Sequence, residues 1–164
     1  MASGPLTKEK ALERLASLCS RSEQCESDLT KKLLNWDINA GERKEIIEYL
    51  KENRYLDDAR YAKSFANDKA RFSSWGPYKI RFELTKKHIN SSLIKEALSR
   101  VELSVWKEGL LRNAEAKART LDLCGEKGYE DRQKLFRYLI GKGFPSDSAS
   151  KAVSLMRKRR EETE

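Results

Sequence analysis

Cations and aromatic rings share one side of a predicted helix near the middle of the chain. The residues are Tyr78, Lys79, Arg81, Phe82 and Lys86. A helix turns by about 100° per residue, so Ile80 and Leu84 face inward while these residues fall on the other side. Cations suit phosphates or an acidic protein surface, and rings stack on bases or anchor a partner. We therefore predict a contact surface here, although Tyr78 and Phe82 could instead pack against a neighbouring repeat, with the cations at its rim.

Two further groups of cations are weaker candidates for partner contacts. They are Lys63, Lys69 and Arg71 upstream, and Arg112, Lys117 and Arg119 downstream. Helix cations interspersed with Asp and Glu usually form a solvated face, so each group has that simpler explanation as well. Arg60 follows Asp57 closely, and we expect it to bridge the helix start to a neighbouring unit. The basic block 157–160 could serve only to cap a terminal helix and to aid solubility.

No set of residues suited to catalysis or metal binding stands out in the sequence. His88 is the single histidine, and no acid, base or nucleophile pattern accompanies it. Cys19, Cys25 and Cys124 form no Cys-x-x-Cys pair, which argues against a zinc site or a disulfide framework. Cys25 at a helix start could be a reactive thiol, but a structural role is favoured. We therefore expect no cofactor, no metal and no enzyme, but a protein that acts by binding.

Composition favours an interacting protein of the cytoplasm. The 164 residues include 34 Lys and Arg against 26 Asp and Glu, a formal net charge of +8. This excess favours approach to a polyanion such as nucleic acid, although many solvated helical proteins are equally basic. No run of 18 uncharged apolar residues occurs, and the start Met1–Pro5 lacks the regions of a signal peptide. We therefore expect no membrane association.

Capping residues and apolar spacing predict a chain of short helices. Thr7 or a neighbour starts the first helix, and Asn39 with Glu42 forms a capping box for the third. Proline is favoured in the first helical turn, so a helix should run from Pro77 to about His88. With 37% charged residues and few Pro or Gly, the whole chain is predicted to be all-α.

Two of the predicted helices carry specific expectations about burial and length. For the helix capped by Asp57, the buried stripe is expected at Tyr61, Phe65 and Phe72, or at neighbours on the Asp68 side. A long helix should begin near Ser104 and end near Gly125. After it come a short helix, a turn at 143–145 and a last helix.

An apolar pair recurs once in each third of the chain. The pairs are Leu29/Leu33, Ile80/Leu84 and Leu135/Leu139, separated by 51 and then 55 residues. With the same helix order around each pair, this favours three tandem three-helix repeats of about nine helices in an elongated or curved array. We place the repeats at 1–56, 57–103 and 104–164, the last with the basic tail. One irregular nine-helix bundle is the alternative.

Several segments resemble the RecX family. The segment Leu56-Asp57-Asp58-Ala59-Arg60-Tyr61-Ala62, then Gly76-Pro77-Tyr78-Lys79-Ile80, is similar to the central repeat of that family. Residues 18–33 are similar to its first repeat, and Leu139-x-x-Lys142-Gly143-Phe144 to its third. Cys25 stands where the family usually has a serine cap. His88 replaces a common glycine, and Trp36-Asp37-Ile38 replaces a glycine turn, so these departures concern the ends of helices.

The resemblance implies a small protein without catalytic activity that lodges in the groove of the RecA recombinase filament. Its partners would be that filament and single-stranded DNA, reached directly or through the filament, and it would act as a monomer. It would restrain ATP hydrolysis, strand exchange and RecA-assisted repressor self-cleavage, either by occupying the groove or by blocking filament growth. The alternative is a free-standing helical DNA-binding module or transcription regulator. An enzyme acting on nucleic acid is disfavoured, because acid, base and metal sets are missing.

Overall fold

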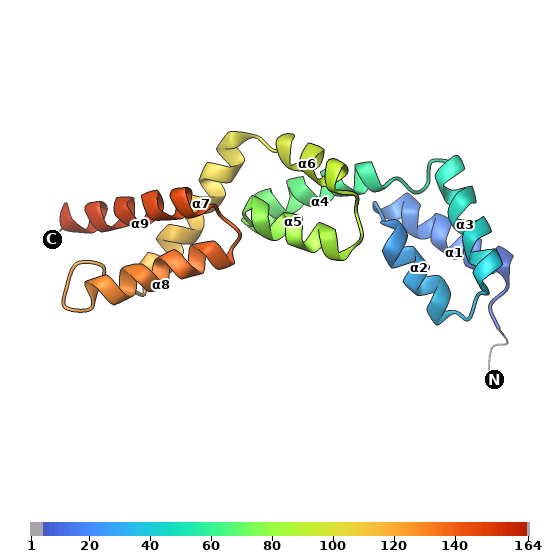
Figure 1. Cartoon of the computed structure of the whole chain (residues 1–164), viewed down its shortest axis with the longest axis horizontal. Helices are drawn as coiled ribbons and strands as arrows, with labels where there is room; N and C mark the ends of the chain where they lie inside the picture. Colours follow the sequence, from blue (N-terminus) through green and yellow to red (C-terminus); the bar gives the residue numbers. More distant parts are fainter. Residues whose placement is uncertain (1–4, 164) are drawn as a thin grey trace. The chain divides into compact units, whose positions relative to one another are not determined.

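The computed structural model describes residues 5–163, and this part of the chain is all-α (Figure 1). Its nine helices in chain order are α1 (Lys8–Arg21), α2 (Glu26–Asn35), α3 (Ala40–Glu52), α4 (Asp58–Phe72), α5 (Pro77–Lys86), α6 (Ser91–Ser99), α7 (Leu103–Ala118), α8 (Gly128–Gly141) and α9 (Ser146–Glu161). The all-helical prediction is confirmed. None of these helices has the length and apolar character needed to span a membrane.

The chain divides into two compact units that do not follow the predicted repeat boundaries. Unit 1 contains the residues up to Ser64 together with Leu84–Ile94. Unit 2 contains Phe65–Glu83 and the chain from Lys95 onward. Helices α4, α5 and α6 therefore each contribute to both units. The repeat boundaries and the elongated arrangement remain predictions.

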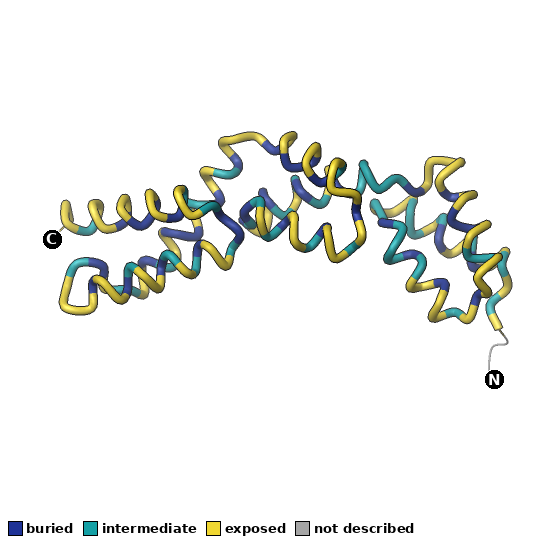
Figure 2. The backbone as a smooth tube through the Cα atoms, in the orientation of Figure 1, coloured by how far each residue is buried: buried dark blue, intermediate teal, exposed yellow. Residues whose placement is uncertain are grey.

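The core of unit 1 lies between α1, α2 and α3. Its buried residues are Ala11, Leu15, Leu29, Leu33, Ile38, Ile46, Ile47, Leu50 and Leu56 (Figure 2). The predicted caps hold these helices in place. The Thr7 hydroxyl accepts from the Lys10 amide at the start of α1, and the Asn39 side chain accepts from the Glu42 amide at 2.9 Å at the start of α3.

The start of α4 is hydrogen-bonded to the segments that follow α1 and α3. Asp57 accepts from the amides of Ala59 and Arg60 at 2.9 and 3.1 Å, so the predicted cap is confirmed. Arg60 Nε donates to Glu23 at 2.9 Å, and its terminal nitrogen donates to the Arg54 carbonyl at 3.0 Å. Arg60 thus takes the structural role expected for it.

Two carboxylates join α2 to later parts of unit 1. Lys87 donates to Asp28 at 2.6 Å. Burial alone would raise the pKa of Asp28, but the hydrogen bonds from Lys87 and Cys25 outweigh it and the net pKa is lowered. Asp58 accepts from the Glu26 amide at 3.0 Å, and burial raises the pKa of Asp58. Asp58 therefore supplies the side-chain oxygen at the start of α2 that Cys25 does not.

In unit 2, α7, α8 and α9 pack against one another pairwise. Their shared core is Ala114, Ala118, Leu123, Leu135, Leu139, Ala149, Ala152, Val153 and Met156 (Figure 2). The end of α9 is held by its cations: Arg159 pairs with Glu115 at 2.8 Å, and Arg160 donates to the Ala118 carbonyl at 3.1 Å. The basic block therefore extends α9 to Glu161 and binds it to α7.

The buried stripe of α4 differs from the expected one. Ala62, Ala66 and Ala70 are fully or almost fully buried, whereas Phe72 is 82% exposed and Tyr61 and Phe65 are half-buried. Residues spaced by four share one face of a helix, and the alanines occupy that face. The prediction of an aromatic buried stripe was therefore wrong. The small side chains of the alanines let this helix pack closely against its neighbours.

Helix α7 ends at Ala118 and not near Gly125. The chain turns away so that Leu123 is buried in the core with α8 and α9. Polar contacts hold this turn: Asp131 accepts from the Asp122 amide at 2.8 Å, and Arg132 donates to the Leu123 carbonyl at 2.6 Å. The predicted helix was too long because the apolar spacing continues past Ala118. Leu123 is a buried loop residue whose position in the sequence fits the same spacing as a helical residue.

The same left-handed turn ends the second helix of each predicted repeat. The residues with positive φ are Asp37 (56°), His88 (58°) and Gly143 (94°). The amide that follows donates to a leucine carbonyl five residues earlier, from Ile38 to Leu33 (3.1 Å), Ile89 to Leu84 (3.2 Å) and Phe144 to Leu139 (3.3 Å). These turns are spaced 51 and 55 residues apart, as the apolar pairs are. The internal similarity seen in sequence therefore has a structural counterpart.

Backbone contact between Gly76 and Gly143 joins two parts of unit 2. The Gly76 amide donates to the Lys142 carbonyl at 2.7 Å, and the Tyr78 amide donates to the Gly143 carbonyl at 2.9 Å. A Cβ at Gly76 would lie 2.3 Å from the Gly143 carbonyl, and one at Gly143 would lie 2.4 Å from the Lys79 nitrogen. Only glycine fits at both positions.

Replacing Gly143 with alanine should destabilise the protein by about 2–4 kcal/mol, because the new Cβ meets backbone atoms and φ stays positive. Chemical denaturation monitored by circular dichroism measures the change. Gly141→Ala is the control, since a Cβ at Gly141 meets nothing within 4 Å. Its stability should be unchanged or slightly raised. Equal effects of the two substitutions would contradict the close-contact account.

Replacing His88 with glycine should stabilise the protein by about 0.5–1 kcal/mol, because glycine adopts the left-handed conformation at less cost. The melting temperature should rise by about 1–4 °C. Thr85→Gly lies in the helical part of α5 and should instead lower stability by about 0.5–1 kcal/mol. A loss of stability in His88→Gly would show that the imidazole makes a contact worth more than the backbone strain.

Candidate nucleic-acid and partner interface

The two rings predicted on α5 are exposed. Tyr78 is 55% exposed and Phe82 is 62% exposed, while Ile80 and Leu84 are fully buried. Arg81 is also exposed, and its guanidinium lies 5.9 Å from the centre of the Tyr78 ring. Helical spacing therefore sorted the residues of this helix correctly.

Trp75 organises the cations beside this helix. Lys79 Nζ lies 4.3 Å from the centre of the Trp75 ring, and Lys69 Nζ lies 4.8 Å from it. Phe65 meets the same ring edge to face at 6.3 Å. Cation–π contacts of this kind are worth roughly 0.5–2 kcal/mol each, so they hold both ammonium groups near one indole. Lys69 and Lys79, predicted separately, are thus brought together.

The turn after α8 fixes the start of this interface. Because the Lys142 and Gly143 carbonyls accept from Gly76 and Tyr78, the first turn of α5 is bound to that turn by its backbone. These carbonyls accept amides that a helix start otherwise leaves unpaired. The direction in which Tyr78 and Arg81 leave α5 is therefore set by contacts within unit 2.

Arg112 is engaged in holding the end of α4. It donates to the Ser74 hydroxyl at 2.9 Å, and more weakly to the Arg71 carbonyl at 3.4 Å. The neighbouring Asn113 is buried and donates to the Ser74 carbonyl at 2.7 Å. Ser74 itself has a positive φ of 52°. Arg112 therefore stabilises a strained turn, and any partner contact would be additional to that role.

Phe72 is exposed beside a small pocket of unit 2. The pocket has a volume of about 340 Å³ and is lined by Ala70, Arg71, Phe72, Val105, Glu108, Gly109 and Arg112. Arg71 also donates to Asn67 at 2.8 Å and lies 3.6 Å from Glu102. This ring was expected in the buried stripe of α4. It is instead exposed and lines the same pocket as two of the predicted cations, Arg71 and Arg112.

The remaining predicted cations are dispersed. Lys117 lies 5.5 Å from the centre of the Tyr138 ring, which Lys142 also approaches at 5.4 Å. Arg119 is exposed just after α7. Lys86 is exposed in the last turn of α5 and belongs to unit 1, whereas the other nine predicted residues belong to unit 2.

Two of the three cysteines lie in surroundings that disfavour a reactive thiolate. Cys25 is buried, and burial raises the pKa of its thiol, which disfavours the reactive thiolate. Burial likewise raises the pKa of Cys19. Between residues 5 and 163, no three His, Cys, Asp or Glu side chains gather in a way that could hold a metal ion.

Two family models match the chain. One describes the second three-helix domain of RecX and matches residues 57–98, and the other describes its third three-helix domain and matches residues 110–153. The chain belongs to the RecX family. The first range covers α4, α5 and all but the last residue of α6, and the second covers α8 with parts of α7 and α9. Together they include all ten residues predicted for the interface. The family resemblance seen in the sequence is thereby confirmed.

Relatives in sequence and structure agree with the family models. A regulatory protein RecX from Clostridium botulinum is 30% identical over 84% of this chain and 64% of its own length. A crystal structure of regulatory protein RecX matches with a TM-score of 0.76 at 29% identity, over 86% of this chain and 68% of the other. RecX from Lactobacillus salivarius shares the fold, with a TM-score of 0.77 at 23% identity over 91% and 96%. The chain spans less than two thirds of the clostridial relatives that it matches.

Proposed function

We propose that this chain regulates a RecA recombinase, mainly as an inhibitor. It binds in the groove of the RecA–DNA filament as a monomer in the cytoplasm, without catalysing a reaction. Bound there, it suppresses ATP hydrolysis, strand exchange and the coprotease activity of the filament. Membership of the RecX family supports this role, since the relatives carry the name regulatory protein RecX.

The exposed ring-and-cation face of α5 is the observation that carries the proposal. Tyr78 and Phe82 keep more than half of their surface in solvent on a helix whose other face is fully buried. Tyrosine and other large aromatic side chains are among the residues that dominate binding energy at protein interfaces. Exposed rings on one helix face are suited to anchor a protein partner, so we assign Tyr78 and Phe82 to the recombinase.

The cations beside these rings are assigned to the nucleic acid in the filament. Lys69 and Lys79 converge on Trp75, and Arg81 lies next to Tyr78. Phosphate contacts give affinity without reading sequence, which suits a protein that must act wherever a filament forms. Rings for the protein and cations for the phosphates would together recognise a filament better than either component alone.

A free-standing DNA-binding module is the second candidate. It is favoured by the three-helix domains, since helical units of this size also bind duplex DNA. Such a module would prefer one duplex sequence, and its affinity would fall steeply with salt. A filament regulator should show no sequence preference on naked duplex.

Purified protein added to RecA on single-stranded DNA should suppress ATP turnover at equimolar amounts or below. In the double variant Tyr78→Ala/Phe82→Ala, the concentration needed for half suppression should rise at least about tenfold, because two interface rings are lost. A coupled ATPase assay measures both. The control is Tyr49→Ala/Tyr129→Ala, which removes two exposed rings of α3 and α8 and should act like the unaltered protein.

Circular dichroism should show the same helix content for all three proteins. Unchanged ATP turnover at excess of the unaltered protein would count against recombinase regulation. Equal effects of the two double variants would leave no special role for the α5 face.

A further inference from the structure

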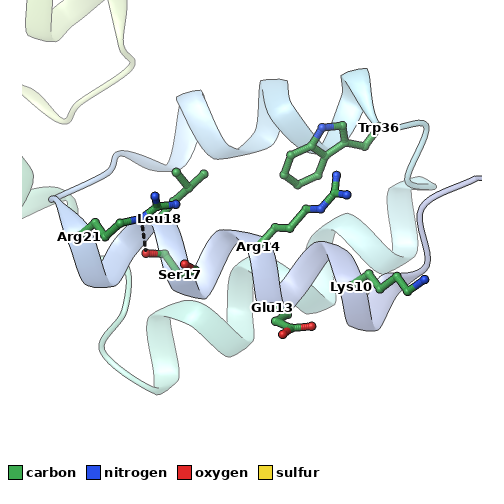
Figure 3. Close-up of a pocket in the computed structure, with 7 residues that line it drawn as sticks. All are labelled: Lys10, Glu13, Arg14, Ser17, Leu18, Arg21 and Trp36. Carbon is green, nitrogen blue, oxygen red and sulfur yellow. Dashed lines mark hydrogen bonds between the residues drawn. The ribbon is translucent and has the colours of Figure 1, made fainter. Parts of the chain in front are cut away.

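Unit 1 contains a cationic groove outside the residues that the family models match. It has a volume of about 650 Å³ and is lined by Lys10, Glu13, Arg14, Ser17, Leu18, Arg21 and Trp36 (Figure 3). This volume lies within the range of roughly 300–1,000 Å³ that is typical of ligand sites. All of its lining residues come from α1 and from the end of α2.

The cations of this groove lie on one face of α1. Lys10, Arg14 and Arg21 are separated by four and seven residues, which is helical spacing. With a rise of about 1.5 Å per residue, they form a line about 16 Å long. Glu13 is the one acidic residue of the lining, and in Figure 3 its side chain points away from the Trp36 ring. The groove is therefore a row of positive charge.

The groove cations form no ion pairs with carboxylates of the described residues. Within the part of the chain that the structure describes, Lys10, Arg14 and Arg21 make no salt bridge, whereas Lys8 pairs with Glu45 and Lys51 with Glu26. Arg21 Nε donates to the Ser17 carbonyl at 3.4 Å. Three cations on one helix face repel one another, and this repulsion raises the free energy of the folded protein. An anionic ligand bound along this face would lower that free energy.

Trp36 adds an aromatic surface to this row. Its ring is partly buried against the core of unit 1, and the Arg14 guanidinium lies 5.7 Å from its centre (Figure 3). The left-handed turn at Asp37 directly after it fixes where α2 ends and hence where the ring stands. An indole beside a guanidinium offers a stacking surface for a planar base.

We propose that this groove binds a short segment of single-stranded nucleic acid, with Trp36 stacking on a base and Lys10, Arg14 and Arg21 contacting phosphates. A single strand fits better than a duplex, because paired bases are stacked on one another and offer no free face to the indole. It also fits better than an acidic peptide, which would satisfy the cations but leave the ring without a planar partner. The site is independent of the proposed recombinase contact, because it needs no filament and uses none of the α5 residues.

Fluorescence of Trp36 can report this binding directly. In the background Trp75→Phe/Trp106→Phe, Trp36 is the only tryptophan left of the three in the chain. Titration with an oligothymidylate of about 12 nucleotides, without recombinase, should quench its emission saturably. Adding Arg14→Ala/Arg21→Ala to this background should raise the Kd at least about tenfold and lower the slope of log K against log salt by about 1.4.

The matched control removes two cations elsewhere in the chain. Lys44→Ala/Lys107→Ala lowers the net charge equally and should raise the Kd by less than about threefold. Thermal melts establish that all variants are folded, and a milder variant, Arg14→Gln/Arg21→Gln, replaces any that is not. The proposal is overturned if the oligonucleotide leaves Trp36 emission unchanged, if both alanine pairs weaken binding equally, or if poly-glutamate quenches with the same affinity.

Discussion

Close backbone contact between Gly76 and Gly143 is the constraint on which the interface of unit 2 depends. Two chain segments 67 residues apart approach so closely that neither can carry a Cβ. The carbonyls of residues 142 and 143 then accept the first amides of α5. Because that helix start is bound by backbone and not by flexible side chains, the rings that leave α5 have a fixed direction. Preorganisation of this kind lowers the entropy lost when a partner binds.

Much of this architecture could be predicted from the sequence because local signals and burial agreed. Asn39 and Asp57 cap helices where their types and spacing indicated, and the 51- and 55-residue spacing returned as equivalent helix-ending turns. The glycines that the family pattern has in place of Asp37 and His88 also have a structural reason. Both residues adopt positive φ, which is the conformation for which glycine is favoured.

Other features could not be read from one sequence, because they depend on which segments meet. Phe72 was expected in a buried stripe with Tyr61 and Phe65, yet alanines occupy the buried face of α4. Trp75 was overlooked because it lies between two helices. The spacing of four residues in Phe65/Lys69 and Trp75/Lys79 was a signal that could have indicated the cluster. The candidate site on α5 was thus predicted, but Trp75, which brings its cations together, was not.

The basic residues behind the net charge of +8 have two kinds of role: some stabilise the fold, and others are candidates for ligand contact. Arg60, Arg112 and Arg160 donate to backbone carbonyls at the ends of other helices, so they complete the fold. Composition cannot separate such cations from those that face a ligand. Only the geometry distinguishes a guanidinium that caps a helix from one that lies over an exposed ring.

A photocrosslink from α5 tests the central claim most directly. Benzoylphenylalanine in place of Phe82 should crosslink to the recombinase when filaments on single-stranded DNA are present. The same group in place of Tyr129, which is 69% exposed on α8, should give little product. Equal yields from both positions, or none from position 82 while the protein remains folded, would contradict the assignment of α5 as the filament-contacting helix.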